Sequence, residues 1–229
     1  MTKGIFVTAT GTDVGKTYIS ALLVKKLRQE NINCGYYKPV LSGAEVIDGE
    51  LVQGDCEYVK NIAELPEKPL ELLSYAFTHP LSPHLAAKIE DNPIKLNKIK
   101  FDFNKIKQKY DYILVEGAGG IVCPMDLSDK KLFLIEDIIK GLGLSVIVVA
   151  SAALGSINSA VTTVEYAKNH GIKVNGIILN HFDKSDIMQQ DNKLQIEKLT
   201  KVQVIATVAD NTPNIEIELS MLLNTFEEI

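Results

Sequence analysis

A glycine-bearing segment near the N-terminus has the residue types that bind phosphate groups. Residues 9–17 read ATGTDVGKT, and the last three match the end of the phosphate-loop pattern G-x-x-x-x-G-K-[ST]. The first glycine of the pattern falls on Thr10, with Gly11 beside it, so the match is imperfect. The context favours phosphate binding, because a short apolar strand precedes the segment and helical periodicity follows it.

Each part of this segment has a separate task in binding a nucleotide. Backbone N–H groups of the loop and of the next helix would face the phosphates, with the positive end of the helix dipole behind them. Lys16 would reach the β- and γ-phosphates, and Thr17 would offer its hydroxyl to Mg²⁺. The ordinary alternative is a glycine turn that precedes a helix. A dinucleotide loop G-x-G-x-x-G fits less well, because neither Gly11 and Gly15 nor the glycines after Glu116 have its spacing.

Three charged residues outside the loop occupy positions where an α/β sheet exposes its ligand edge. Glu116 ends one apolar strand, Lys38 ends another before Pro39, and Asp55 follows Gly54 at the start of a helix. Carboxylates there could ligate Mg²⁺, and a lysine could stabilise developing negative charge. Each also has an ordinary alternative: an acid before a turn, a solvated lysine and a helix cap.

Strands and helices that alternate along most of the chain must position these residues. The predicted strands cover residues 4–8, 34–38, 112–115, 145–150, 174–179 and 202–208. The predicted helices follow the phosphate loop, Asp55 and Pro83, and cover residues 96–106, 135–142, 157–164 and 215–226. This alternation predicts a single α/β domain over residues 1–229, with a mainly parallel sheet, helices on both faces and a P-loop NTPase architecture. Ligands of such sheets bind beyond the carboxyl ends of the strands.

Composition excludes several classes of function. A formal net charge of −5 argues against a general nucleic-acid binder, which needs a basic excess. The three cysteines form neither a disulfide framework nor a zinc pattern, which favours a reducing cytosol. The N-terminus does not read as a signal peptide, and no apolar run approaches the roughly 20 residues of a membrane span. We therefore expect a cytoplasmic protein that binds neither nucleic acid nor membrane.

Six blocks of sequence together resemble the dethiobiotin synthetase family, and the resemblance covers nearly the whole chain. The blocks are TGTDVGKT at 10–17, YKPV with SG at 37–43, GD at 54–55, SPH at 82–84, VEGAGG at 115–120 and LGSIN at 154–158. Their shared order and spacing are more specific than any one block. The resemblance implies an ATP-dependent ligase of biotin biosynthesis. It would join CO₂ or bicarbonate to 7,8-diaminononanoate and close a ureido ring, releasing ADP and phosphate.

The resemblance also assigns roles to individual residues. Lys16 and Lys38 would act on the transferring phosphoryl group and the carbamate, and Ser42 would contact the diamine or carbamate. The implied Mg²⁺ ligands are Thr17, Asp55 and Glu116. The implied ATP-binding residues are Asp13, Val14, Gly15, Lys16, Thr17, Tyr18, Asp55, Glu116, Gly117, Ala118, Gly119, Asn180, His181, Ala209, Asp210 and Asn211. Among these, Asn180 matches the family's adenine-reading asparagine.

The family resemblance further implies a homodimer in which the partner chain contributes to the substrate site. The tail carboxylate of the diamine substrate would lie at a helix N-terminus built from Gly155, Ser156, Ile157 and Asn158. A simple strand-to-helix turn is the alternative for this stretch. Two rival functions remain: a partition or septum-positioning ATPase, whose loop usually carries an additional early lysine, and a cobyrinic-acid amide ligase, which usually carries a further glutaminase domain.

Overall fold

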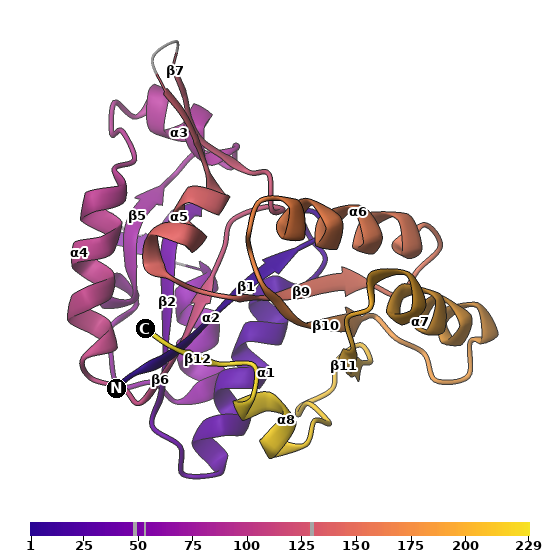
Figure 1. The fold of residues 1–229 in the computed structure, drawn as a ribbon. Helices are drawn as coiled ribbons and strands as arrows, with labels where there is room; N and C mark the ends of the chain where they lie inside the picture. Colours follow the sequence, from indigo (N-terminus) through magenta and orange to yellow (C-terminus); the bar gives the residue numbers. More distant parts are fainter. Residues whose placement is uncertain (48–49, 53, 129–130) are drawn as a thin grey trace.

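The centre of the molecule is a mainly parallel β-sheet, as the sequence predicts (Figure 1). The computed structural model describes residues 1–47, 50–52, 54–128 and 131–229. The strand order is β11-β10-β9-β1-β6-β2-β5, and β12 pairs antiparallel with β1. The strands are β1 (Lys3–Ala9), β2 (Cys34–Ser42), β5 (Leu73–Phe77), β6 (Tyr112–Glu116), β9 (Val146–Ser151), β10 (Val174–Asn180), β11 (Val204–Val208) and β12 (Glu227–Glu228).

Helices cover both faces of the sheet (Figure 1). They are α1 (Lys16–Gln29), α2 (Gly54–Ala63), α3 (Pro83–Ile89), α4 (Leu96–Lys107), α5 (Ile135–Leu142), α6 (Ser156–Asn169), α7 (Ile187–Thr200) and the short α8 (Leu219–Leu223). The pairs α1–α2, α4–α5 and α6–α7 pack together. Right-handed crossovers place the first pair on one face and the other two pairs on the opposite face.

The central strands are apolar along nearly their whole length because helices cover them on both sides. In β6, for example, Ile113, Leu114 and Val115 are fully buried, and each contributes about 1.5–3 kcal/mol by leaving water. The sheet order brings the carboxyl ends of β1, β6 and β2 side by side. The chain leaves β1 toward β2 on one side and returns to β9 on the other, so a ligand crevice is expected at the tip of β1.

Strand β2 is longer than the sequence predicts, because Pro39 does not end it. Pairing with β6 stops at Tyr37, but pairing with β5 continues to Ser42. Proline has no N–H to donate, and it is tolerated where one neighbouring strand has already ended. The extension carries Ser42 to the ligand edge of the sheet.

The predicted closing helix over residues 215–226 is wrong except for its centre. Only Leu219–Leu223 is helical, and Glu227–Glu228 pairs with Lys3 and Gly4 at the start of β1. Phe226 is buried and meets the Tyr112 ring edge-on, with ring centroids 5.3 Å apart. The apolar spacing therefore records packing of an irregular segment against the sheet and not one continuous helix.

Several elements were not predicted. They are the edge strand β5, helix α7, the 3₁₀ turn Pro69–Leu72 and two hairpins, β3 (Glu45–Ile47) with β4 (Glu50–Val52) and β7 (Pro124–Ser128) with β8 (Lys131–Leu134). Helix α7 was missed for a physical reason, because its apolar residues do not form one stripe. Of these residues, Ile196 is buried, whereas Ile187, Leu194 and Leu199 are exposed. Within the described ranges, no helix has both the length and the apolar character needed to cross a bilayer.

Candidate active site

The phosphate loop connects the end of β1 to the start of α1. Asp13 and Gly15 have positive φ angles of 58° and 91°, which turn the backbone sharply before the helix begins at Lys16. Gly15 cannot be replaced without strain, because a Cβ there would lie 2.2 Å from Asn180 Nδ2. Lys16 is only 8% exposed, and its Nζ donates to the Gly11 carbonyl at 3.3 Å, so the side chain folds back over the loop. This shape presents N–H groups and an ammonium group to one point.

Lys38, Asp55 and Glu116 meet beside this loop. Lys38 Nζ lies 2.5 Å from Asp55 Oδ2 and 2.6 Å from Glu116 Oε1. Thr17 Oγ1 donates to the same Glu116 oxygen at 2.9 Å. Glu116 is completely buried, so its charge depends on these partners. The structure thus brings together the five polar side chains that the sequence placed near the phosphates, Lys16 included.

The charges in this cluster shift one another's titration. Burial lowers the pKa of Lys16, and the nearby Lys38 ammonium lowers it further. Burial would also lower the pKa of Lys38, but Glu116 and Asp55 outweigh it and raise that pKa above its ordinary value. For Asp55, burial favours a higher pKa, yet the Lys38 ammonium keeps it below the usual range. Lys38 is therefore charged and already paired. An incoming anion would stabilise the charged form of Lys16, which has no such partner among the described residues to offset its burial.

The donor set at this point fits Mg²⁺. Thr17, Asp55 and Glu116 offer a hydroxyl and two carboxylates, which are hard oxygen ligands. Mg²⁺ usually takes only one or two carboxylates from a protein and fills its other positions with water and phosphate oxygens. In the part of the chain that the structure describes, no group of three or more His, Cys, Asp or Glu side chains could hold a metal by itself. The hydroxyl and two carboxylates would leave the other positions of such an ion to water and phosphate oxygens.

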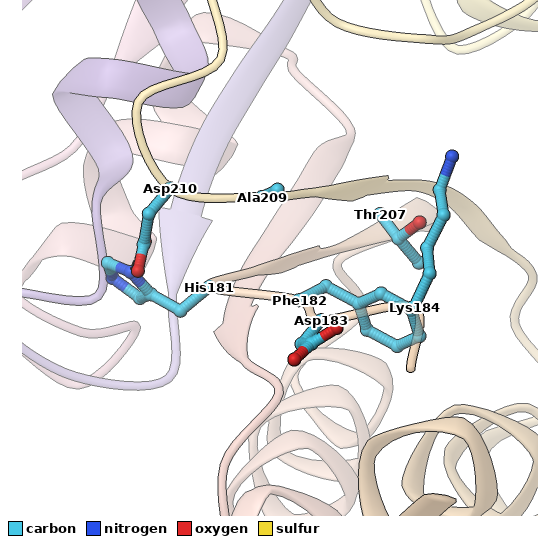
Figure 2. Close-up of a pocket in the computed structure, with 7 residues that line it drawn as sticks. All are labelled: His181, Phe182, Asp183, Lys184, Thr207, Ala209 and Asp210. Carbon is cyan, nitrogen blue, oxygen red and sulfur yellow. Dashed lines mark hydrogen bonds and ion pairs between the residues drawn. The ribbon is translucent and has the colours of Figure 1, made fainter. Parts of the chain in front are cut away.

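A pocket at the tips of β10 and β11 is lined by three of the predicted base-binding residues, and Asn180 and Asn211 are not among its lining residues. It has a volume of about 410 Å³ and is lined by His181, Phe182, Asp183, Lys184, Thr207, Ala209 and Asp210. Figure 2 shows the His181 ring and the Asp210 carboxylate facing each other on one side, and a hydrogen bond joins them. Asn180 Nδ2 donates to the Val14 carbonyl at 3.1 Å, which ties this pocket to the phosphate loop. Asn180 Oδ1 is buried without a partner among the described residues.

The remaining predicted residues lie at the same edge of the sheet but are less closely connected. Gly117 and Gly119 begin the loop after β6, and Gly117 N donates to the Val7 carbonyl at 3.0 Å. Ser42 Oγ is buried without a hydrogen-bond partner among the described residues. Residues 155–158 form the turn into α6 and its first residues, beyond the end of β9. No hydrogen bond between described residues joins this stretch to Lys38 or Ser42.

Comparisons with known proteins place this chain in a family. The model of a family described as an AAA domain matches residues 3–215. The ATP-dependent dethiobiotin synthetase BioD of Clostridium botulinum (strain 657 / Type Ba4) is 51% identical over 229 residues, which is 100% of both chains. The same enzyme from strain Alaska E43 / Type E3 is 53% identical over 204 residues, or 89% of each chain.

This chain belongs to the dethiobiotin synthetase family. The resemblance predicted from the sequence blocks is confirmed, since identity of this level extends along the full chain. The similarity to solved structures supports the fold alone. A ParA family ATPase from Chlorobium tepidum TLS matches with a TM-score of 0.54 at 17% identity, covering 90% of this chain and 83% of that one. MinD from Aquifex aeolicus matches with a TM-score of 0.53 at 14% identity, covering 91% and 82%.

One residue of this dethiobiotin synthetase site was missed by sequence reasoning. Tyr36 donates its phenol O–H to Glu116 Oε2 at 3.0 Å, and both side chains are fully buried. A signal for it was present: side chains alternate along a strand, so Tyr36 shares the face of β2 that carries Lys38. The alternation becomes informative only once β6 is known to be the neighbour of β2.

Proposed function

We propose that this chain is an ATP-dependent dethiobiotin synthetase that converts 7,8-diaminononanoate, CO₂ and ATP into dethiobiotin, ADP and phosphate. The observation that carries the proposal is the full-length similarity to such enzymes in a chain whose Lys38, Asp55 and Glu116 converge beside a phosphate loop. The partition-ATPase alternative is supported only by distant structural neighbours at 14–17% identity, which share the fold.

In the proposed reaction, the lysines stabilise negative charge as it moves. CO₂ adds to one amine of the substrate, which loses a proton and becomes a carbamate. A carbamate oxygen attacks the γ-phosphorus, and the bond to the β-phosphate oxygen breaks to release ADP. The second amine then attacks the carbonyl carbon, loses a proton to the departing phosphate or water, and expels phosphate, which closes the ring. Lys16 would hold the β- and γ-phosphates, and Lys38 would stabilise charge on the carbamate and the transferring group.

Thr17, Asp55 and Glu116 would hold Mg²⁺, which supplies charge neutralisation for the phosphates when bound. The chain's own contribution is to fix these oxygens around one point and to exclude water from Glu116. Because Lys38 bonds to both carboxylates, its ammonium competes with any cation for them. We infer that Lys38 turns from the carboxylates toward the carbamate when the nucleotide binds.

The nucleotide would extend from the loop to the pocket of Figure 2. Asp13 and the amides of Val14 to Tyr18 would line the phosphates and ribose, with Ala118 nearby. Asn180 Oδ1, a buried acceptor with no described partner, suits the exocyclic amine of adenine. His181, Ala209, Asp210 and Asn211 would lie beside the base.

The diamine would lie over Ser42, whose buried hydroxyl has no described partner. Its tail carboxylate would meet the first turn of α6, formed by residues 155–158, in a second copy of the chain. Helix α6 has 14 residues, and its first residue, Ser156, is buried. The helix dipole would favour an anion at this N-terminus. This arrangement makes a homodimer part of the proposal.

A reaction assay tests the proposed function. Purified protein with ATP, Mg²⁺, bicarbonate and 7,8-diaminononanoate should give ADP in a coupled assay and a cyclic urea by mass spectrometry. Omitting either the diamine or bicarbonate should stop both products, because the carbamate is the phosphoryl acceptor. ADP formation that persists without the diamine, with no urea, would contradict the proposal and favour a partner-switch ATPase.

The Mg²⁺ assignment makes a separate prediction for Asp55. Asp55→Asn removes a charged oxygen ligand, so the Mg²⁺ concentration for half-maximal rate should rise by about tenfold or more. Glu57→Gln is the matched control, since Glu57 is an exposed acid in the same first turn of α2. Magnesium titrations of ADP formation compare the two. An unchanged midpoint in Asp55→Asn would remove Asp55 from the metal site.

A further inference from the structure

The two oxygens of Glu116 have different partners. Oε1 accepts from Thr17 at 2.9 Å and lies 2.6 Å from Lys38 Nζ, so it faces the phosphate loop. Oε2 accepts from the phenol of Tyr36 at 3.0 Å. Glu116 and Tyr36 are both 0% exposed, so water does not compete for this hydrogen bond.

The sheet register explains why Tyr36 reaches this carboxylate. Tyr36 pairs with Leu114 across β2 and β6, and side chains two residues apart along a strand share a face. Glu116 therefore lies on the same face as Tyr36 and Lys38, and it sits between them. The adjacent Tyr37 points to the opposite face, where its hydroxyl contacts Ser74 and donates to the Ile99 carbonyl at 3.2 Å.

The phenol of Tyr36 restricts the one torsion of Glu116 that is otherwise soft. Rotation about the last bond of a glutamate side chain has broad energy wells, so a carboxylate without a second contact turns easily. The Tyr36 phenol donates its O–H to Oε2, and a carboxylate oxygen can only accept, so the direction of this hydrogen bond is fixed. A donor fixed on Oε2 leaves Oε1 directed at the loop.

We propose that Tyr36 is a positioning residue that orients Glu116 for Mg²⁺ binding. This inference rests on the proposed function, because it takes Glu116 as a ligand of the nucleotide-associated ion. Tyr36 itself does not reach the substrates. Its contribution is to hold Glu116 in the rotamer that a metal needs, so that binding does not have to order the carboxylate first.

Matched phenylalanine variants test the proposal. Tyr36→Phe keeps the ring that fills the core and removes only the donor, whereas Tyr37→Phe makes the same change on the opposite face of β2. Binding of Mn²⁺ in the presence of ADP is followed by electron paramagnetic resonance of the free ion, and the Mg²⁺ midpoint of ADP formation is measured in parallel. We expect Mn²⁺ affinity to fall about tenfold in Tyr36→Phe, as for other outer-shell partners, and less than about twofold in Tyr37→Phe.

Melting temperatures separate positioning from stability. Both variants lose a buried hydrogen bond, so both should melt at a somewhat lower temperature. Tyr36→Phe with a lower melting temperature but wild-type Mn²⁺ affinity would overturn the proposal, as would equal losses of affinity in both variants. If Tyr36→Phe does not fold, 4-fluorophenylalanine at position 36 restores the volume without a donor. Failure of that variant to fold as well would assign Tyr36 to stability and reject the positioning role.

The controls also separate this inference from the proposed function. If the wild-type protein forms no cyclic urea, the synthetase proposal fails whatever the variants do. If the wild type is active and Tyr36→Phe has normal Mn²⁺ affinity, only the role of Tyr36 fails.

Discussion

Lys16→Ala will lower the rate of ADP and cyclic-urea formation by about a thousandfold or more, the loss typical when a charge-stabilising donor is removed from a transition state. Lys16 is the cation folded over the phosphate loop, with its Nζ 3.3 Å from the Gly11 carbonyl. No other ammonium group in the described site is free, because Lys38 is bonded to Asp55 and Glu116. The alanine variant therefore leaves the β- and γ-phosphates without their direct counter-ion.

The same substitution should not destabilise the fold. Burial, with repulsion from Lys38, lowers the pKa of Lys16, so the folded protein disfavours this charge and gains nothing by keeping it. We expect Lys16→Ala to melt at or above the wild-type temperature, measured by circular dichroism. Lys26→Ala, on the same helix and paired with Glu30 at the surface, is the control and should keep full activity. Wild-type turnover in Lys16→Ala would refute the phosphate assignment.

Lys38→Met will reduce kcat by about a hundredfold or more while changing the affinity for ATP much less. Lys38 would meet charge that develops on the carbamate and the transferring group, and its loss should appear mainly in the transition state. Binding of ATP is measured by isothermal titration calorimetry and the rate by the coupled assay. Lys105→Met, an exposed lysine on α4, is the control. An equal loss in ATP affinity and rate would show that Lys38 acts in ground-state binding.

Lys38→Met should also lower stability by about 3–5 kcal/mol at neutral pH, because Glu116 stays buried without its cation. The pH dependence of the folding stability provides a second test of this pairing. In the wild type, the lowered pKa of Asp55 contributes stability above its unfolded pKa, and this contribution disappears as pH falls through the folded pKa. Without Lys38, only Thr17 and Lys16 would counter the effect of burial on the Asp55 pKa. That pKa should then no longer be lowered as strongly, so acid should remove less stability from the variant than from the wild type. Because the ordinary Asp55 pKa is 3.8 and the folded one is lower, melting curves between about pH 2 and about pH 6 would show the deficit shrinking toward acid.

The sequence was most informative where chemistry follows directly from chain position. Lys16 and Thr17 come after a strand and at the start of a helix, and Lys38 and Glu116 come at or near strand ends, so local pattern alone placed them at the ligand edge. That Lys38 bridges Asp55 and Glu116 depends on β2 lying next to β6, and sheet order is a long-range property that periodicity does not encode.

Other misses came from packing that overrides local preference. Pro39 continues β2 because β6 has already ended beside it, which no property of the proline itself reveals. The apolar residues after Pro213 have helical spacing, but the end of the chain pairs with β1 and takes Glu227 and Glu228 into the sheet. Tyr36 reads as one more core aromatic until the register places its hydroxyl on Glu116.

The contact between Gly15 and Asn180 limits how such a protein can diverge. The Asn180 amide occupies the space where any side chain at position 15 would begin, so the residue proposed to read the base is also packed on the phosphate turn. A bulkier residue at position 180, selected to admit a different base, would push on the turn that cradles the triphosphate. Under the proposed base site, a change at position 180 that alters base preference would also alter turnover, whereas Ala209 and Asp210 line the pocket and are not packed on Gly15.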